Sequence, residues 1–143
     1  MRINQVLQTK GANVITIVPE ATVRDLVALL NEHNLGALVV TTDGTTVQGI
    51  VSERDVVRRL ASDPDVLDAP VSDIMTAEVR SCEPGESVDH LMHLMTEHRI
   101  RHVPVLVDGG LAGIISIGDV VKSRIGELEF ERDQLTNYVA NTQ

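Results

Sequence analysis

The sequence predicts a mixed α/β (α+β) fold in which two copies of one strand–helix–strand–strand–helix unit pack as a single pseudo-symmetric module, followed by a C-terminal helical extension. Three observations predict this class. The chain repeats itself, the hydrophobic period changes in the same order in both copies, and an apolar stripe continues past the second copy. With 143 residues, 43% of them hydrophobic, the chain suffices for one compact domain but not for two independent ones.

The repeat is clearest in one short motif. GIVSERDVV at 49–57 returns as GIISIGDVV at 113–121. An offset of 65 residues, which becomes 64 after a glycine turn, also aligns Val23 with Val88 and many other positions. Because each copy is too small to bury its own apolar face, we expect the copies to pack together. The expected divisions are a first copy with an N-terminal lead at 1–66, a second copy at 67–124 and a helical tail at 125–143.

Each copy is expected to begin with a short strand and a helix. The β-rich stretches NVITIV and EVRSC occupy 13–18 and 78–82. Each is followed by a segment that has proline at its start and apolar residues at helical spacing, at 19–33 and 84–98. The pattern therefore changes from strand to helix at the same place in both copies.

Two more strands and a second helix complete each copy. An Asp-Gly turn joins the two strands, as is typical of a β-hairpin. The expected strands are 37–42 and 47–51 in the first copy, and 102–107 and 111–115 in the second. The repeated motif then leads into the expected helices at 54–61 and 118–139.

The order of elements, their spacing and the doubled motif resemble the paired cystathionine-β-synthase (CBS) domains known as a Bateman module. The resemblance covers residues 10–124, nearly the whole chain, in two CBS repeats. We expect no catalytic or channel domain beside them. The resemblance therefore implies a stand-alone CBS-pair protein.

The Ser-x-x-Asp turns, Ser52 with Asp55 and Ser116 with Asp119, allow two interpretations. One is a capping box, in which the hydroxyl and the carboxylate bind free amides at the start of a helix. The other is a ligand site, because helix N-termini favour anions and a carboxylate can accept hydrogen bonds from both ribose hydroxyls. The residues alone leave both interpretations open.

The family resemblance favours the ligand site and implies that Asp55 and Asp119 each bind a ribose. It also implies crossed clefts, in which the early strand of one repeat faces the turn of the other. The first cleft would comprise Ser52, Arg54, Asp55, Thr76, Val79, Arg101, His102 and Val103. The second cleft would comprise Thr9, Lys10, Val14, Gly36, Ala37, Ser116 and Asp119.

The two expected clefts differ in charge. Arg101 and His102 lie where nucleotide-binding kinase regulatory subunits of the family carry a histidine–arginine pair, here in reverse order, and Arg54 could add a bidentate phosphate contact. The equivalent positions of the second cleft are Gly36 and Ala37, which offer no cation. We therefore expect the first cleft to suit a monophosphate such as AMP and the second to take an adenosine-like or dinucleotide ligand such as NAD(H); ATP is a further candidate ligand of the module.

Composition excludes several other functions. A net charge of −9 argues against binding to nucleic acid or to an anionic membrane, and no apolar run is long enough to span a bilayer. The N-terminus lacks a signal-peptide core, so we expect a cytoplasmic protein.

The single cysteine, Cys82, has no ligands at zinc spacing, so we expect no metal and no cofactor other than the regulatory nucleotide. No nucleophile–base pair or phosphate-binding glycine loop is apparent, which predicts a regulatory sensor and not an enzyme. The alternative function is a ligand-free protein-interaction adaptor.

The tail carries its own apolar stripe. Hydrophobic residues recur at three- and four-residue spacings at Val121, Ile125, Leu128, Leu135 and Val139. We expect this stripe to support a homodimer. We also expect a second partner, an unidentified protein that the module regulates. The alternative is a helix that folds back on its own module.

Overall fold

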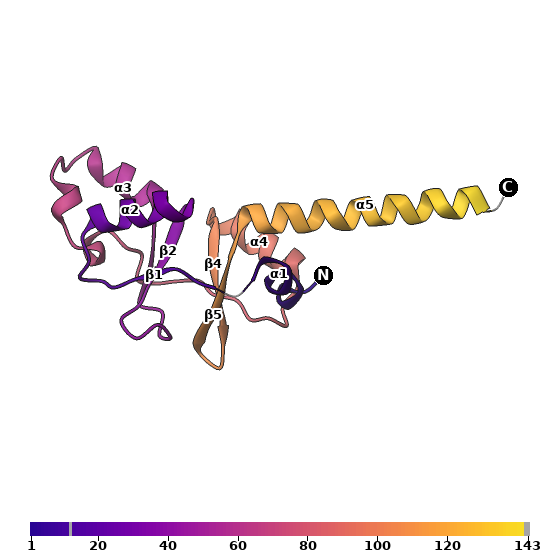
Figure 1. The fold of residues 1–143 in the computed structure, drawn as a ribbon, viewed down its shortest axis with the longest axis horizontal. Helices are drawn as coiled ribbons and strands as arrows, with labels where there is room; N and C mark the ends of the chain where they lie inside the picture. Colours follow the sequence, from indigo (N-terminus) through magenta and orange to yellow (C-terminus); the bar gives the residue numbers. More distant parts are fainter. Residues whose placement is uncertain (12, 142–143) are drawn as a thin grey trace.

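A computed structural model describes residues 1–11 and 13–141. Its elements, shown in Figure 1, follow the predicted order. The helices are α1 (Ile3–Lys10), α2 (Val23–His33), α3 (Glu53–Leu60), α4 (Val88–His98) and α5 (Ile117–Asn141), with short 3-10 turns η1 (Val66–Asp68) and η2 (Val71–Asp73). The strands are β1 (Thr16–Ile17), β2 (Ala37–Val40), β3 (Gly49–Ser52), β4 (His102–Val107) and β5 (Gly110–Ser116). The predicted mixed fold is confirmed, and α1 is an addition to it.

The two repeats form two small sheets of the same design. In the first, β2 pairs in parallel with β1 and in antiparallel register with β3; in the second, β4 pairs in antiparallel register with β5. The stretch predicted as the second copy's first strand keeps only one parallel bridge, between Cys82 and Val105. This bridge is 65 residues on from the Ile17–Val40 pair, so the repeat in sequence is also a repeat in pairing.

Each repeat has its own hydrophobic core, but the segment that precedes a repeat packs on the other one. Helix α1 lies beside α4 and α5 in Figure 1, and its buried Ile3 and Val6 join the core of the second repeat. Val66 and Val71 of the turns η1 and η2 join the core of the first. The expected N-terminal lead of the first copy therefore belongs, by packing, to the second.

Matching backbone hydrogen bonds fix this exchange. Val23 N donates to Ala69 O at 2.9 Å, and its repeat partner Val88 N donates to Met1 O at 3.0 Å. Each bond joins the first residue of a helix to the segment that crosses over from the other repeat. Since a free amide at a helix start needs an acceptor, the crossing segments also cap α2 and α4.

Glycine in the repeated motif allows the crossing segments to come close to the sheets. A Cβ at Gly49 would lie 2.7 Å from Met75 Sδ and 2.9 Å from Thr76 O. A Cβ at Gly113 would lie 2.6 Å from Leu7 Cδ2. At position 49 a Cβ would meet a backbone carbonyl, which cannot move aside, whereas at position 113 it would meet only the end of a flexible side chain.

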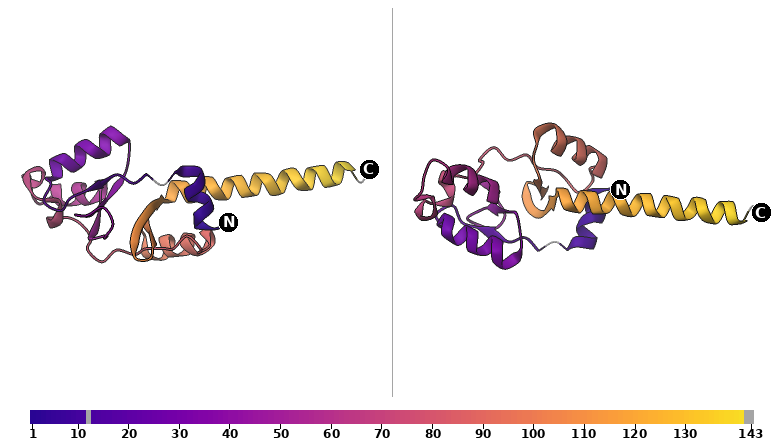
Figure 2. Two further views of the ribbon diagram at one scale, coloured as in Figure 1. Left: turned by 60° about the horizontal axis from the view of Figure 1, so that its bottom comes forward. Right: turned by 90° about the horizontal axis from the view of Figure 1, so that it is seen from above.

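Helix α5 is 25 residues long and runs on from the repeated motif without a break. Figures 1 and 2 show that it projects beyond α1 and α4 and does not fold back on the module. The last two residues of the predicted tail, 142 and 143, lie outside the described residues. In the described part of the chain, no helix is both long and apolar enough to cross a membrane.

Candidate functional site

The first predicted cleft is a real cavity of about 230 Å³ where the two repeats meet. Six of its eight predicted residues line it: Ser52, Arg54, Asp55, Thr76, Arg101 and His102. Helix α3 supplies Arg54 and Asp55, the segment after η2 supplies Thr76, and β4 with the residue before it supplies the Arg101–His102 pair. The cleft is therefore built from both repeats.

Two predicted residues lie elsewhere. Val103 is completely buried in the core of the second repeat. Neighbouring residues of a strand face opposite sides, so when His102 lines the cleft, Val103 faces the core. Val79 is half-buried and does not line the cavity.

The Ser52–Asp55 turn forms a capping box and keeps one carboxylate oxygen available. Asp55 Oδ2 accepts hydrogen bonds from Ser52 N at 2.8 Å and from Ser52 Oγ at 3.1 Å, and Asp55 N donates to Ser52 Oγ at 3.3 Å. Asp55 Oδ1 has no hydrogen-bond partner among the described residues. The capping and ligand-binding interpretations are therefore compatible, because Oδ2 takes part in the helix cap and Oδ1 is free to accept hydrogen bonds from a ligand.

The cations of this cleft are largely unpaired. The guanidinium groups of Arg54 and Arg101 make no hydrogen bond or ion pair within the described residues. Burial lowers the pKa of His102 below its ordinary value, and the nearby positive charge of Lys10 lowers it further, whereas Glu53 and Asp119 act in the opposite direction. His102 is therefore mainly neutral at pH 7, and the arginines supply the positive charge.

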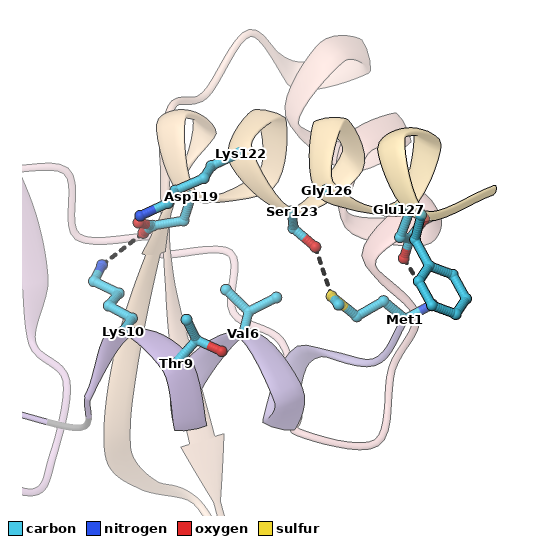
Figure 3. A pocket seen from close by; sticks show the side chains of 10 residues that line it. Met1, Val6, Thr9, Lys10, Asp119, Lys122, Ser123, Gly126 and Glu127 are labelled. Atoms are coloured by element: carbon cyan, nitrogen blue, oxygen red, sulfur yellow. Dashed lines mark hydrogen bonds and ion pairs between the residues drawn. The ribbon is translucent and has the colours of Figure 1, made fainter. Parts of the chain in front are cut away.

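The second predicted cleft is divided. Thr9, Lys10 and Asp119 line a groove of about 620 Å³ between α1 and α5, which Figure 3 shows from close by. Val14 lines a separate cavity of about 270 Å³ beside Leu111. Ser116 is half-buried, and its hydroxyl accepts a hydrogen bond from Asp119 N at 3.1 Å.

Gly36 and Ala37 line the cleft that holds Asp55, not the groove that holds Asp119. A Cβ at Gly36 would lie 3.2 Å from the ring atom Cε1 of His102. The two residues and their repeat equivalents, Arg101 and His102, thus face each other in one cavity. The small side chains make room for the imidazole there.

A lysine already binds the carboxylate of the second turn. Lys10 Nζ donates to Asp119 Oδ2 at 2.6 Å (Figure 3). It also donates to the carbonyl of Ile114 at 2.7 Å. Burial opposes ionisation of Asp119, but hydrogen bonds from Lys10 and Ser116 outweigh it and hold the pKa of this carboxyl below its ordinary value. In the other repeat, the carbonyl equivalent to that of Ile114 belongs to Ile50 and accepts the backbone N–H of Thr76 at 2.9 Å. The repeat symmetry is broken where the lysine side chain replaces that amide.

Sequence reasoning missed three charged residues of the Asp55 cleft, namely Glu53, Arg58 and Arg99. Arg58 is four residues after Arg54 on α3, so helical spacing was a signal for it. Arg99 follows α4 in a left-handed conformation with φ 54°, and its only signal was its proximity to Arg101. Within the described ranges, no three His, Cys, Asp or Glu side chains gather as metal ligands would.

The fold and the repeated sequence define the class of protein. The family model for the CBS domain matches residues 6–62 and 71–126, two segments whose starts are 65 residues apart. The chain therefore belongs to the CBS domain family and carries two copies of the domain.

Known proteins similar to this chain are CBS domain-containing proteins. The mitochondrial CBS domain-containing protein CBSX3 of Arabidopsis thaliana is 36% identical over 146 residues, a match that covers 96% of this chain and 71% of that protein. The crystal structure of a CBS-domain-containing protein of Agrobacterium tumefaciens is 42% identical with a TM-score of 0.84, and the match covers 87% of this chain and 99% of the other.

A more distant structure shares the fold and contains ligands. The CBS domain pair of protein MJ0100, crystallised with 5′-methylthioadenosine and S-adenosyl-L-methionine, has a TM-score of 0.77 at 24% identity. The match covers 85% of this chain and 98% of that one.

Proposed function

We propose that this protein is a regulatory module that binds an adenine nucleotide in the Asp55 cleft, with AMP as the simplest ligand that satisfies the site. One observation carries the proposal: Asp55 Oδ1 is unpartnered beside unpaired cations in a cavity shared by both repeats. An ionised carboxylate can accept hydrogen bonds from both hydroxyls of a ribose. That a CBS pair of the same fold was crystallised with two adenosine derivatives supports this ligand class.

The charges of the cleft suit the phosphate. Arg54 and Arg101 come from opposite repeats and line the same cavity without an acidic partner. Charge-assisted hydrogen bonds from guanidinium to phosphate are stronger than neutral ones. A phosphate held between the two arginines would join the repeats, which gives the ligand a physical means to change their arrangement.

The Asp119 site is less available. Asp119 Oδ1 has no hydrogen-bond partner among the described residues, but Lys10 Nζ lies 2.6 Å from Oδ2 and already neutralises the carboxylate, which makes it a weaker acceptor for a ribose. We propose that the Asp55 cleft fills first and discriminates AMP from adenosine. Any adenosine-like or dinucleotide ligand, such as NAD(H), would bind at Asp119 more weakly.

Thermal unfolding with millimolar AMP, ATP, NAD or adenosine tests the proposal against the adaptor alternative. A ligand at 100 times its dissociation constant adds about 2.7 kcal/mol to the free energy of unfolding. We expect AMP and ATP to raise Tm. An unchanged Tm with all four compounds would leave the Ser-x-x-Asp turns as helix caps and favour an adaptor.

We also propose a homodimer formed through α5. Large apolar side chains along this helix are strongly exposed, among them Ile125 at 50%, Leu128 at 48% and Leu135 at 66%. Burial of such side chains against a second copy would remove an apolar surface from water. Sedimentation should give a dimer at micromolar concentration that Leu128→Glu converts to a monomer; a monomeric wild-type protein would remove the dimer.

The module is proposed to be a cytoplasmic sensor without catalytic activity of its own, which acts on a further protein. Incubation of the purified protein with AMP, ATP or NAD tests the lack of catalytic activity, because turnover of any of these compounds would show that the protein is an enzyme.

A further inference from the structure

Two more arginines line the Asp55 cleft beyond those assigned to the first phosphate. Arg58 comes from the second turn of α3, and Arg99 is the residue that ends α4. We infer that Arg58 and Arg99 form a subsite for outer phosphates, so that this cleft prefers a nucleoside di- or triphosphate to a monophosphate. The inference rests on the proposed function and specifies the ligand class of the same site.

The arginines of this cleft differ from most others in the molecule. Five arginines outside it bind an acid or a backbone carbonyl: Arg2, Arg24, Arg59, Arg124 and Arg132. In the described part of the chain, the four guanidinium groups of the cleft make no hydrogen bond or ion pair, and of the arginines outside it only Arg80 shares this state. In a protein of net charge −9, four unpaired arginines in one cavity indicate an anionic ligand.

The backbone at Arg99 gives an independent indication. Arg99 has φ 54°, and its repeat equivalent Asn34 has φ 52°, so both helices end in the left-handed conformation. Asparagine tolerates this conformation well, whereas a long side chain rarely adopts it. The left-handed conformation itself closes the helix, since Arg99 N donates to Met95 O, but helix capping gives no reason for an arginine with an unpaired guanidinium at this position.

The other half of the repeat lacks this charge. The positions equivalent to Arg54, Arg99 and Arg101 hold Gly118, Asn34 and Gly36, and only Arg58 has a cationic equivalent, Lys122. Helix capping would be served equally well by either set. The cations are thus specific to the Asp55 cleft and are not a general property of the repeat.

The charged side chains of the cleft differ in how far they are buried. Asp55, Arg54 and His102 are half-buried, whereas Arg58, Arg99 and Arg101 are exposed. The cavity of about 230 Å³ is smaller than the usual range of roughly 300 to 1,000 Å³ for a ligand pocket, so part of a nucleotide must lie at the mouth. With the ribose at Asp55 and the first phosphate between Arg54 and Arg101, a phosphate chain directed outward would meet Arg58 and Arg99.

The balance of charge also favours more than one phosphate. Four arginines face two carboxylates, Glu53 and Asp55, so with His102 neutral the lining carries +4 − 2 = +2. Two of the arginines are enough to neutralise the charge of a monophosphate. The di- and triphosphate groups add the negative charge that the other two can neutralise.

Calorimetric titrations with adenosine, AMP, ADP, ATP and inorganic tripolyphosphate, all without divalent cations, test the inference. We expect ATP to bind the wild-type protein at least tenfold more tightly than AMP. Arg58→Gln and Arg99→Asn should each lower ATP and tripolyphosphate affinity at least fivefold and change AMP affinity less than twofold. Arg99→Asn introduces the residue of the equivalent position, so the backbone should tolerate it.

Arg80→Gln is the matched control, because Arg80 is an exposed, unpaired arginine outside the cleft and its loss should leave every affinity unchanged. Equal affinities for AMP and ATP, or equal losses of both in the cleft variants, would overturn the inference and leave the proposed function intact. Tripolyphosphate binding that depends on Arg58 and Arg99, without binding of any nucleoside compound, would overturn the proposed function and retain the polyphosphate site. Absence of all binding would overturn both.

Discussion

Removal of the Lys10 ammonium group should destabilise the protein and release the Asp119 carboxylate. In Lys10→Met the side chain keeps its unbranched apolar stem but loses two hydrogen bonds, to Asp119 Oδ2 and to Ile114 O. The side chains of the pair are 31% and 23% exposed, so solvent screens their attraction only in part. We expect a loss of about 1 to 2 kcal/mol, from a partly buried ion pair and one charge-assisted bond to a carbonyl.

The pH dependence of this effect has a definite sign. Because folding lowers the pKa of Asp119 below its ordinary 3.8, the stabilisation is complete above pH 3.8 and is lost as the pH falls through the folded-state value. The difference in stability between wild type and Lys10→Met should therefore be largest at neutral pH and shrink below pH 3.8.

Urea unfolding of wild type, Lys10→Met, Asp119→Asn and the double variant measures the coupling of the pair. A loss of about 1 to 2 kcal/mol corresponds to a fall in Tm of roughly 2 to 8 °C for a domain of this size. Lys122→Met is the control, because Lys122 lines the same groove but makes no hydrogen bond or ion pair within the described residues. Strictly additive single variants would show that the two groups do not interact in solution and would refute the reasoning.

Two further predictions concern the fold and pH. Gly49→Ala should lower the free energy of unfolding in urea by about 1 to 3 kcal/mol, because its Cβ would collide with the Thr76 carbonyl. Gly113→Ala should lower it less, because the new Cβ meets only the end of the flexible Leu7 side chain. A larger loss for Gly113→Ala than for Gly49→Ala would contradict the close approach at Gly49. Since burial lowers the pKa of His102 below 6.5, the unfolded state takes up the proton first, and stability should fall as the pH drops below 6.5 and then level off below the folded-state value. His102→Gln should flatten this part of the pH profile, and an unchanged profile would show that folding does not perturb the group.

Local patterns predicted most elements because the decisive signals were local. The stretch predicted as a strand at 102–107 is β4 itself, and the doubled motif opens α3 and α5 as a helix start should. Helix α1 was missed, although Ile3, Val6, Leu7 and Lys10 have helical spacing. Its partners are far away in sequence, since Ile3 N donates to Glu86 O and the side chains of Ile3 and Val6 pack in the core of the second repeat.

The candidate site was predicted better on one side than on the other. Symmetry assigned Gly36 to the Asp119 cleft, yet it faces His102 in the Asp55 cleft, because residues at equivalent positions meet where the two repeats join. Lys10 was expected to contact a ligand, and the structure shows it paired with Asp119. Both differences arise from the packing between repeats, which no pattern within one repeat can express.

The ribose role of Asp55 is the central claim, and calorimetric titration of AMP into wild type, Asp55→Ala and Asp119→Ala tests it most directly. Asp55→Ala should weaken AMP binding by about 1.5 to 3 kcal/mol, the range for lost hydrogen bonds to a charged group, and adenosine binding should weaken with it because both share the ribose. Asp119→Ala provides the matched control, because it removes the same side chain from the equivalent turn and should leave the affinity of this cleft nearly unchanged. Circular dichroism should confirm that both variants are folded at the temperature of titration. An Asp55→Ala protein that is less stable but binds AMP as tightly as wild type would contradict the claim and leave Asp55 as a helix cap.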